Sequence, residues 1–157
     1  MRARHSVVVA AILFGMVLGL GAYTFVYARG YSYITNDPEA CANCHVMQDH
    51  FDAWTRSSHR SVAACNDCHT PPGHVEKYLV KARNGFWHSF YFTTGRYPDP
   101  IRITPRNQDV TERACRGCHE PIVSAIEPIA FHLIAGAADH AASLSCLQCH
   151  NEVGHIE

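Results

Sequence analysis

The chain has 157 residues, enough for one ordinary domain, and its 13 Lys and Arg are balanced by 14 Asp and Glu. The resulting net charge of -1 excludes the strongly basic surface of a nucleic-acid-binding protein. Eight Cys and twelve His in so short a chain point instead to a disulfide scaffold, zinc sites or haem attachment, and their spacing must decide between these.

The first predicted element is an apolar helix over residues 6–28, which contain no charged side chain. A helix of this length rises about 34 Å, enough to cross a hydrocarbon core about 30 Å thick. A cleavable secretory signal is the alternative, but the apolar region of a signal is only about 7–15 residues long. We therefore expect a single-pass anchor in the cytoplasmic membrane, with residues 1–5 on the cytoplasmic side.

Four copies of the motif Cys-x-x-Cys-His follow this segment and use all eight cysteines. The motif is the signature of covalent haem c attachment, because two thiols and a His at positions i, i+3 and i+4 share one helical face. The thiols can then meet the two vinyl groups while the His reaches the iron. Neither zinc nor a disulfide scaffold requires a His directly after each cysteine pair. The expected thioether residues are Cys41, Cys44, Cys65, Cys68, Cys115, Cys118, Cys146 and Cys149, and the expected proximal iron ligands are His45, His69, His119 and His150.

Four haems, numbered here by motif, would leave too few residues for a protein core of usual size. We therefore expect the macrocycles to form the apolar core, wrapped in short helices and loops. The predicted fold is mostly α with much irregular loop: one transmembrane helix, then a multihaem cytochrome c domain over residues 30–157. The motif spacing divides this domain into two di-haem repeats, about 41–74 and 115–155. Haem c is attached outside the cytoplasm, so the domain is expected in the periplasm.

The two repeats also match in their additional histidines. His59 and His140 each lie six residues before the first Cys of a motif, and His74 and His155 each lie five residues after a motif His. Because each iron needs a second axial ligand, these four are the expected distal ligands. The remaining alternatives are His50 and His132.

Haem 1 differs from the others because Met47 follows His45 by two residues. In this position its thioether can approach the same iron. A thioether ligand favours reduced iron and raises the reduction potential.

The segment between the repeats predicts an amphipathic helix. Lys77, Lys81 and His88 share one face, and the apolar positions at helical spacing are Val75, Tyr78, Leu79, Ala82, Phe86 and Phe90. One interpretation is a helix that covers haem edges with its lysines in solvent. The other is a helix on the bilayer surface, where a quinol reaches haem 1 and His88 accepts a proton.

Two further segments are predicted from prolines and apolar runs. Pro98, Pro100 and Pro105 predict a loop over residues 95–108. The broken apolar stretch 122–142 is expected to wrap haems 3 and 4 or to face a partner.

These motifs together resemble the NapC/NirT type of periplasmic quinol dehydrogenases, and within it the small membrane subunit of the ammonia-forming cytochrome c nitrite reductase. The resemblance is carried by residues 41–47, 57–71, 81–89, 100–107 and 149–155. It implies that Met47 ligates haem 1, that His59 is the distal ligand of haem 3 and that His155 is that of haem 2. It also implies that Lys81 lies beside a menaquinol site near haem 1.

The resemblance leaves two positions open. His88 aligns with an aspartate of one relative, so it is a distal ligand or a base of the quinol site. Haem 4 takes its distal ligand from the catalytic subunit in that relative, whereas His74 or His140 could supply it within this chain.

The function implied is oxidation of menaquinol and transfer of electrons to a periplasmic multihaem nitrite reductase, without reduction of nitrite by this chain itself. One alternative is a quinol dehydrogenase that serves another periplasmic reductase, such as nitrate or trimethylamine N-oxide reductase. A second alternative is an electron-transfer hub with no quinol site of its own. A third is a catalyst acting at an open haem.

Overall fold

The computed structural model describes residues 2–127 and 145–155, and every regular element in these ranges is helical. The prediction of a mostly α fold with much irregular loop is confirmed. The elements are α1 (Arg2–Tyr27), η1 (Gly30–Tyr33), α2 (Pro38–Cys41), η2 (His45–Met47), α3 (Gln48–Arg56), α4 (Cys65–His69), α5 (His74–Thr94), α6 (Pro105–Cys118), α7 (Glu120–Ile126) and α9 (Cys146–Cys149).

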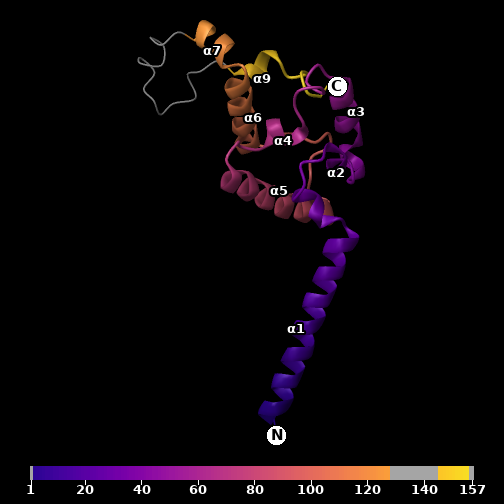
Figure 1. Ribbon diagram of the computed structural model, residues 1–157. Helices are drawn as coiled ribbons and strands as arrows, with labels where there is room; N and C mark the ends of the chain where they lie inside the picture. Colours follow the sequence, from indigo (N-terminus) through magenta and orange to yellow (C-terminus); the bar gives the residue numbers. More distant parts are fainter. Residues whose placement is uncertain (1, 128–144, 156–157) are drawn as a thin grey trace.

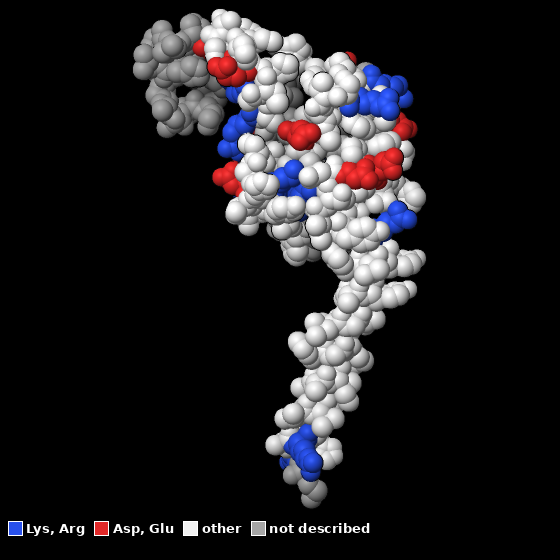
Figure 2. All heavy atoms as spheres, in the orientation of Figure 1, with Lys and Arg blue, Asp and Glu red and all other residues white. Residues whose placement is uncertain are grey.

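Helix α1 stands out from the rest of the molecule as a single long rod (Figure 1). Its 26 residues include none that is buried, and Figure 2 shows no charged side chain between its two ends. A helix that is apolar all round and has no buried residue is typical of a membrane span. Its length and composition are sufficient to cross a membrane, which indicates a single-pass anchor.

The chain leaves α1 through a tight turn that is tied to the first motif. Arg29 adopts a left-handed conformation, with φ of 51°, and turns the backbone into η1. Its Nη1 donates a hydrogen bond to Oδ1 of Asn43 at 2.6 Å, and Nδ2 of Asn43 donates to Oγ of Ser32 at 2.8 Å. Asn43 lies between the two cysteines of the first motif, so this motif is fixed to the end of the anchor.

Helix α5 crosses the base of the domain, next to the end of α1 (Figure 1). One side of α5 faces the domain and buries Val80 and Lys81. The helix ends at Gly95, whose φ of 66° favours glycine. This placement puts α5 between the anchor and the motif-bearing helices.

The loop before α6 is shorter than predicted. Pro98 and Pro100 lie in it, but α6 already begins at Pro105, so the predicted loop to residue 108 is wrong at its end. Proline is tolerated in the first helical turn, where its missing N–H has no partner to lose. Thr104 caps this turn, its side chain accepting a hydrogen bond from the backbone N–H of Asn107 at 3.4 Å.

The described residues have almost no apolar core of their own. Ala53, Val80 and Val110 are the apolar side chains buried within them. Ordinary domains bury many more, so the space between the helices is suited to large apolar groups that the polypeptide does not supply. Within the predicted apolar stretch 122–142, α7 exposes Ile122 and Ile126, and positions 128–142 lie outside the described residues.

Candidate functional site

Each of the four motifs lies on a short helical segment or at the end of one. The first spans the end of α2 and the start of η2, the second is α4, the third ends α6, and the fourth is α9. All eight cysteines are free of disulfides. The thiols therefore remain available for thioether bonds.

Neighbouring motifs in the sequence are also neighbours in space. Cys41 interacts electrostatically with Cys65, Cys68 with Cys115, and Cys115 with Cys146. Helix α4 packs against α6, which joins the two repeats. The motifs thus form a chain in the order one, two, three, four.

Two histidine pairs have the geometry of bis-imidazole ligation. The ring centroids of His59 and His119 are 6.1 Å apart, and those of His69 and His155 are 6.0 Å apart. An imidazole nitrogen binds a metal at about 2 Å, so two rings on opposite sides of one iron have centroids about 6 Å apart. The donor sets therefore fit haem iron, and each pair joins a His of one repeat to a His of the other.

The orientation of His155 is set by a hydrogen bond. Its Nδ1 lies 3.1 Å from the backbone carbonyl oxygen of His50. A carbonyl only accepts, so Nδ1 carries the hydrogen and Nε2 keeps its lone pair for a metal. The ring of His50 lies edge-on to that of His155 with centroids 5.0 Å apart. His50 thus contributes its carbonyl to the pair of His155 and His69.

The remaining predicted ligands are less closely paired. His45 and Met47 share the single turn η2, and the backbone N–H of Met47 donates to the carbonyl of Cys44 at 2.9 Å. His74 is exposed at the start of α5, and His150 is exposed after α9. Among the other predicted positions, His140 and His132 lie outside the described residues.

A second polar cluster lies beside the first motif. Nζ of Lys81 donates to the carbonyl oxygen of Thr35 at 2.6 Å and to Oδ1 of Asn36 at 3.0 Å. Lys81 is only 5% exposed, so the interpretation that places it in solvent is wrong. Burial, and then the neighbouring charge of Lys77, lowers the pKa of Lys81. Cys41 interacts electrostatically with this ammonium group, so Lys81 lies close to the first motif.

His88 lies on the same side of α5, two turns beyond Lys81. Its Nδ1 is 3.1 Å from the hydroxyl oxygen of Tyr33, which precedes the first motif. Burial raises the pKa of Tyr33 to about 12 and lowers the pKa of His88. At neutral pH the pair is therefore a phenol hydrogen-bonded to a neutral imidazole, which can hold or move a proton.

Comparison with known proteins identifies the family. The family model for the NapC/NirT cytochrome c family, N-terminal region, matches residues 1–157. The chain belongs to the NapC/NirT cytochrome c family. As a cytochrome c of electron transport, it binds haem c covalently.

Individual relatives agree with this assignment. The cytochrome c-type protein NrfH of Wolinella succinogenes is 34% identical over 98% of this chain and 88% of its own length. A putative tetraheme cytochrome-c type protein of Allochromatium vinosum is 27% identical over 90% of this chain and 88% of its own length. Among solved structures, a chain of the cytochrome c nitrite reductase NrfHA complex bound to the HQNO inhibitor matches with a TM-score of 0.61 and 25% identity. That match covers 93% of this chain and 90% of the solved chain.

Tyr33, Thr35 and Asn36 of this NapC/NirT cytochrome were not predicted as site residues. Tyr33 is the last residue of the short helix η1, and Thr35 and Asn36 lie in the irregular segment that follows it. This stretch has no hydrophobic periodicity, so the sequence gives no signal of which helix it meets. Their position in the sequence could have identified them, because the segment 33–36 connects the anchor to the first motif.

Replacement of Gly85 by Ala is expected to destabilise this cluster. A Cβ at this position would lie 3.2 Å from Cγ of the Tyr33 ring, closer than a relaxed contact. Such overpacking costs about 1–3 kcal/mol of unfolding free energy. Thermal unfolding measures the effect, with Ser89→Ala, an exposed change on the same helix, as the control. Equal stability of the two variants would show that the ring of Tyr33 is not held tightly.

Proposed function

We propose that this cytochrome carries four haem c groups, oxidises menaquinol at the periplasmic face of the cytoplasmic membrane and delivers electrons to a periplasmic multihaem nitrite reductase. The observation that carries the proposal is the cluster of buried Lys81, half-buried Tyr33 and exposed His88 beside the first motif. The identity to NrfH and the similarity to the NrfHA complex support the choice of partner. The match to a tetraheme relative supports the haem count.

The proposed haem ligands follow the histidine pairs. His59 and His119 would hold haem 3, and His155 and His69 would hold haem 2, in accordance with their centroid distances. Met47 would share haem 1 with His45, and His74 or His140 remains the proposed distal ligand of haem 4, opposite His150. When bound, the haem irons supply one-electron redox chemistry.

The outward side of α5 supports its placement on the bilayer surface. Val75, Leu79 and Phe86 are 74%, 65% and 63% exposed. They lie away from the buried side of α5. Apolar and aromatic side chains in such a row suit the interfacial region of a membrane. A lipid-soluble quinol could then reach the cluster without crossing water.

The polar side of α5 supplies the groups that quinol oxidation requires. Oxidation of a quinol to a quinone releases two electrons and two protons. An ammonium group has three N–H donors, and two of those of Lys81 are used by Thr35 and Asn36, which leaves one for a quinol oxygen. In the tautomer whose Nδ1–H donates to the oxygen of Tyr33, Nε2 of His88 keeps its lone pair, and we assign this nitrogen to accept one proton. The second proton leaves to water.

Direct reduction by a menaquinol analogue tests the proposal. The purified protein in lipid nanodiscs should show haem reduction in its absorption spectrum when the analogue is added. HQNO, the inhibitor in the solved relative, should slow this reduction in a concentration-dependent way. A hub without a quinol site predicts no reduction by the analogue, although dithionite would still reduce the haems. That result would overturn the proposal.

Co-purification tests the partner separately. The tagged protein, isolated from membranes of cells respiring nitrite, should carry a multihaem subunit that reduces nitrite to ammonia. Isolation with a nitrate or trimethylamine N-oxide reductase would assign the quinol site to another respiratory chain.

A further inference from the structure

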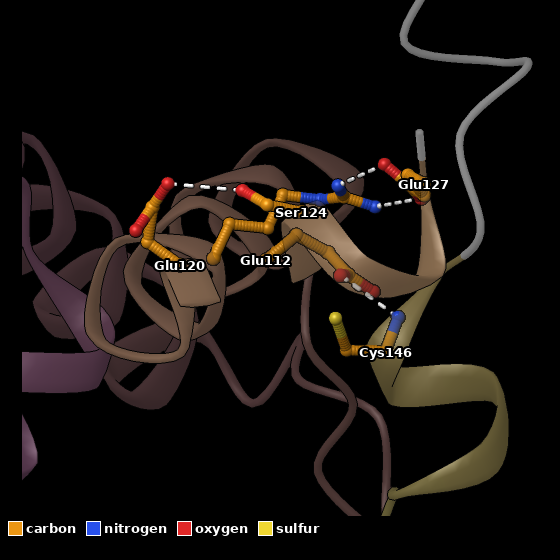
Figure 3. A network of polar contacts seen from close by, with 6 residues as sticks. Glu112, Glu120, Ser124, Glu127 and Cys146 are labelled. Carbon is orange, nitrogen blue, oxygen red and sulfur yellow. Dashed lines mark hydrogen bonds and ion pairs between the residues drawn. The ribbon is translucent and has the colours of Figure 1, made fainter. Parts of the chain in front are cut away.

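The helix of the fourth motif, α9, is capped by a carboxylate from another helix. Glu112 of α6 accepts hydrogen bonds from the backbone N–H groups of Cys146 and Leu147, both at 3.0 Å, and from the hydroxyl of Ser145. Figure 3 shows the Glu112 carboxylate directed at Cys146. Three donors at the start of α9 are therefore satisfied by one side chain that lies three residues before Cys115 of the third motif.

The other motifs obtain their caps locally. In the second motif, Asp67 accepts from the backbone N–H of Ala64 at 2.8 Å, within the same turn. Before the first motif, Asp37 caps α2 through the N–H of Glu39. In the part of the chain that the structure describes, the fourth motif is distinguished by a cap that comes from the helix of a different motif. Glu112 thus fixes the position of motif four relative to motif three.

The Glu112 side chain also places a negative charge at the start of α9. The nearby guanidinium of Arg116 forms a bidentate ion pair with Glu127, at 2.7 and 3.0 Å (Figure 3). Arg116 also interacts electrostatically with Glu112. Its two terminal nitrogens bond to Glu127, however, whereas the hydrogen bonds of Glu112 go to the start of α9. Burial acts to raise the pKa of Glu112, but the hydrogen bonds from Ser145, Leu147 and Cys146 outweigh it and lower the pKa. The carboxylate is therefore ionised at neutral pH.

We propose that Glu112 is a positioning residue for haem 4, which it holds in place through α9 and whose reduction potential it lowers. The residue that bears the haem thioether donates its N–H to this carboxylate, so a negative charge lies close to the macrocycle. Reduction adds one electron and no proton, and a nearby negative charge disfavours the form with the added electron. This proposal does not depend on which reductant or partner the protein uses.

The holoprotein with Glu112→Gln tests the electrostatic effect. Gln keeps an oxygen that can accept from the α9 backbone but removes the charge. Haem count by intact mass should be unchanged, and a spectroscopic redox titration should show one midpoint potential shifted upward with the others in place. The matched control is Asp99→Asn in the loop before α6, where an exposed carboxylate lies sixteen residues before the first Cys of the third motif.

Glu112→Ala tests the positioning effect. This variant removes the acceptor as well as the charge, so the same midpoint should rise and the thermal unfolding temperature should fall below that of Glu112→Gln. If Glu112→Gln shifts no midpoint more than Asp99→Asn does, the proposal is overturned, whether or not the alanine variant folds. An equal rise in the midpoint potentials of all haems would also overturn the proposal, because the charge of Glu112 would then not act on haem 4 in particular.

Discussion

Replacement of His155 by Ala is expected to convert one haem of the oxidised protein from low-spin to high-spin iron. The ring of His155 lies opposite that of His69 at the spacing of two axial ligands, and its Nδ1 is held by the carbonyl of His50. Removal of the imidazole leaves the iron with one strong-field ligand. Electron paramagnetic resonance of the purified holoprotein would show the loss of one low-spin signal and the gain of a high-spin signal.

His50→Ala is a matched control for this prediction. Its ring lies near that of His155, but the hydrogen bond that it provides comes from the backbone carbonyl, which alanine retains. The low-spin signals should therefore persist in His50→Ala. Loss of a low-spin signal in this control, with none in His155→Ala, would assign the distal ligand to His50 instead. His59→Ala should convert a different haem, so the double variant with His155→Ala should lose two low-spin signals.

Replacement of Lys81 by Met is expected to slow menaquinol-dependent haem reduction by roughly 10- to 150-fold. A hydrogen bond from a charged donor contributes about 1.5–3 kcal/mol, which corresponds to this range of rates when it is made to the reacting quinol. Methionine has a similar length and fills the same space, so no large cavity is created. Stopped-flow absorption with a menaquinol analogue measures the rate.

Lys77→Met is the control, because Lys77 lies one turn away on the same helix and is less deeply buried than Lys81. Its rate should remain close to that of the wild type. Lys81 also holds the segment at Thr35 and Asn36, so the dithionite-reduced spectrum and the thermal unfolding of both variants must be compared. A folded Lys81→Met variant with an unchanged rate would remove Lys81 from the quinol site.

Much of the fold could be predicted because its signals are local. The charge-free run before residue 29 and the repeated Cys-x-x-Cys-His spacing depend only on neighbouring residues, and they correctly predicted the apolar helix and the cytochrome c family. Periodicity also correctly grouped Lys81 and His88 on one face of α5. It could not determine which face is inward, since that depends on what the helix meets. The usual assumption that apolar residues face the domain does not hold for α5, where Lys81 is buried and Leu79 is exposed.

The polar contacts between distant segments were not predictable for a different reason. Tyr33 meets His88 across 55 residues of chain, and Glu112 meets Cys146 across 34. Each depends on a single side chain, so no repeating pattern in the sequence records it. The proximity of His59 to His119 and of His155 to His69 agrees with the ligands that the family resemblance implied, although the spacing alone did not give it. Matched spacing within the repeats identified these histidines but did not assign their partners.

The hydrogen bonds from Arg29 to Asn43 and from Asn43 to Ser32 make the anchor more than a flexible tether. Because the first motif is fastened directly to the end of α1, a change in the length of α1 cannot be absorbed before it reaches this motif. One inserted residue would turn the first motif by about 100° around the helix axis and raise it by about 1.5 Å. The length of α1 and the height of the first motif above the bilayer are therefore coupled through these hydrogen bonds.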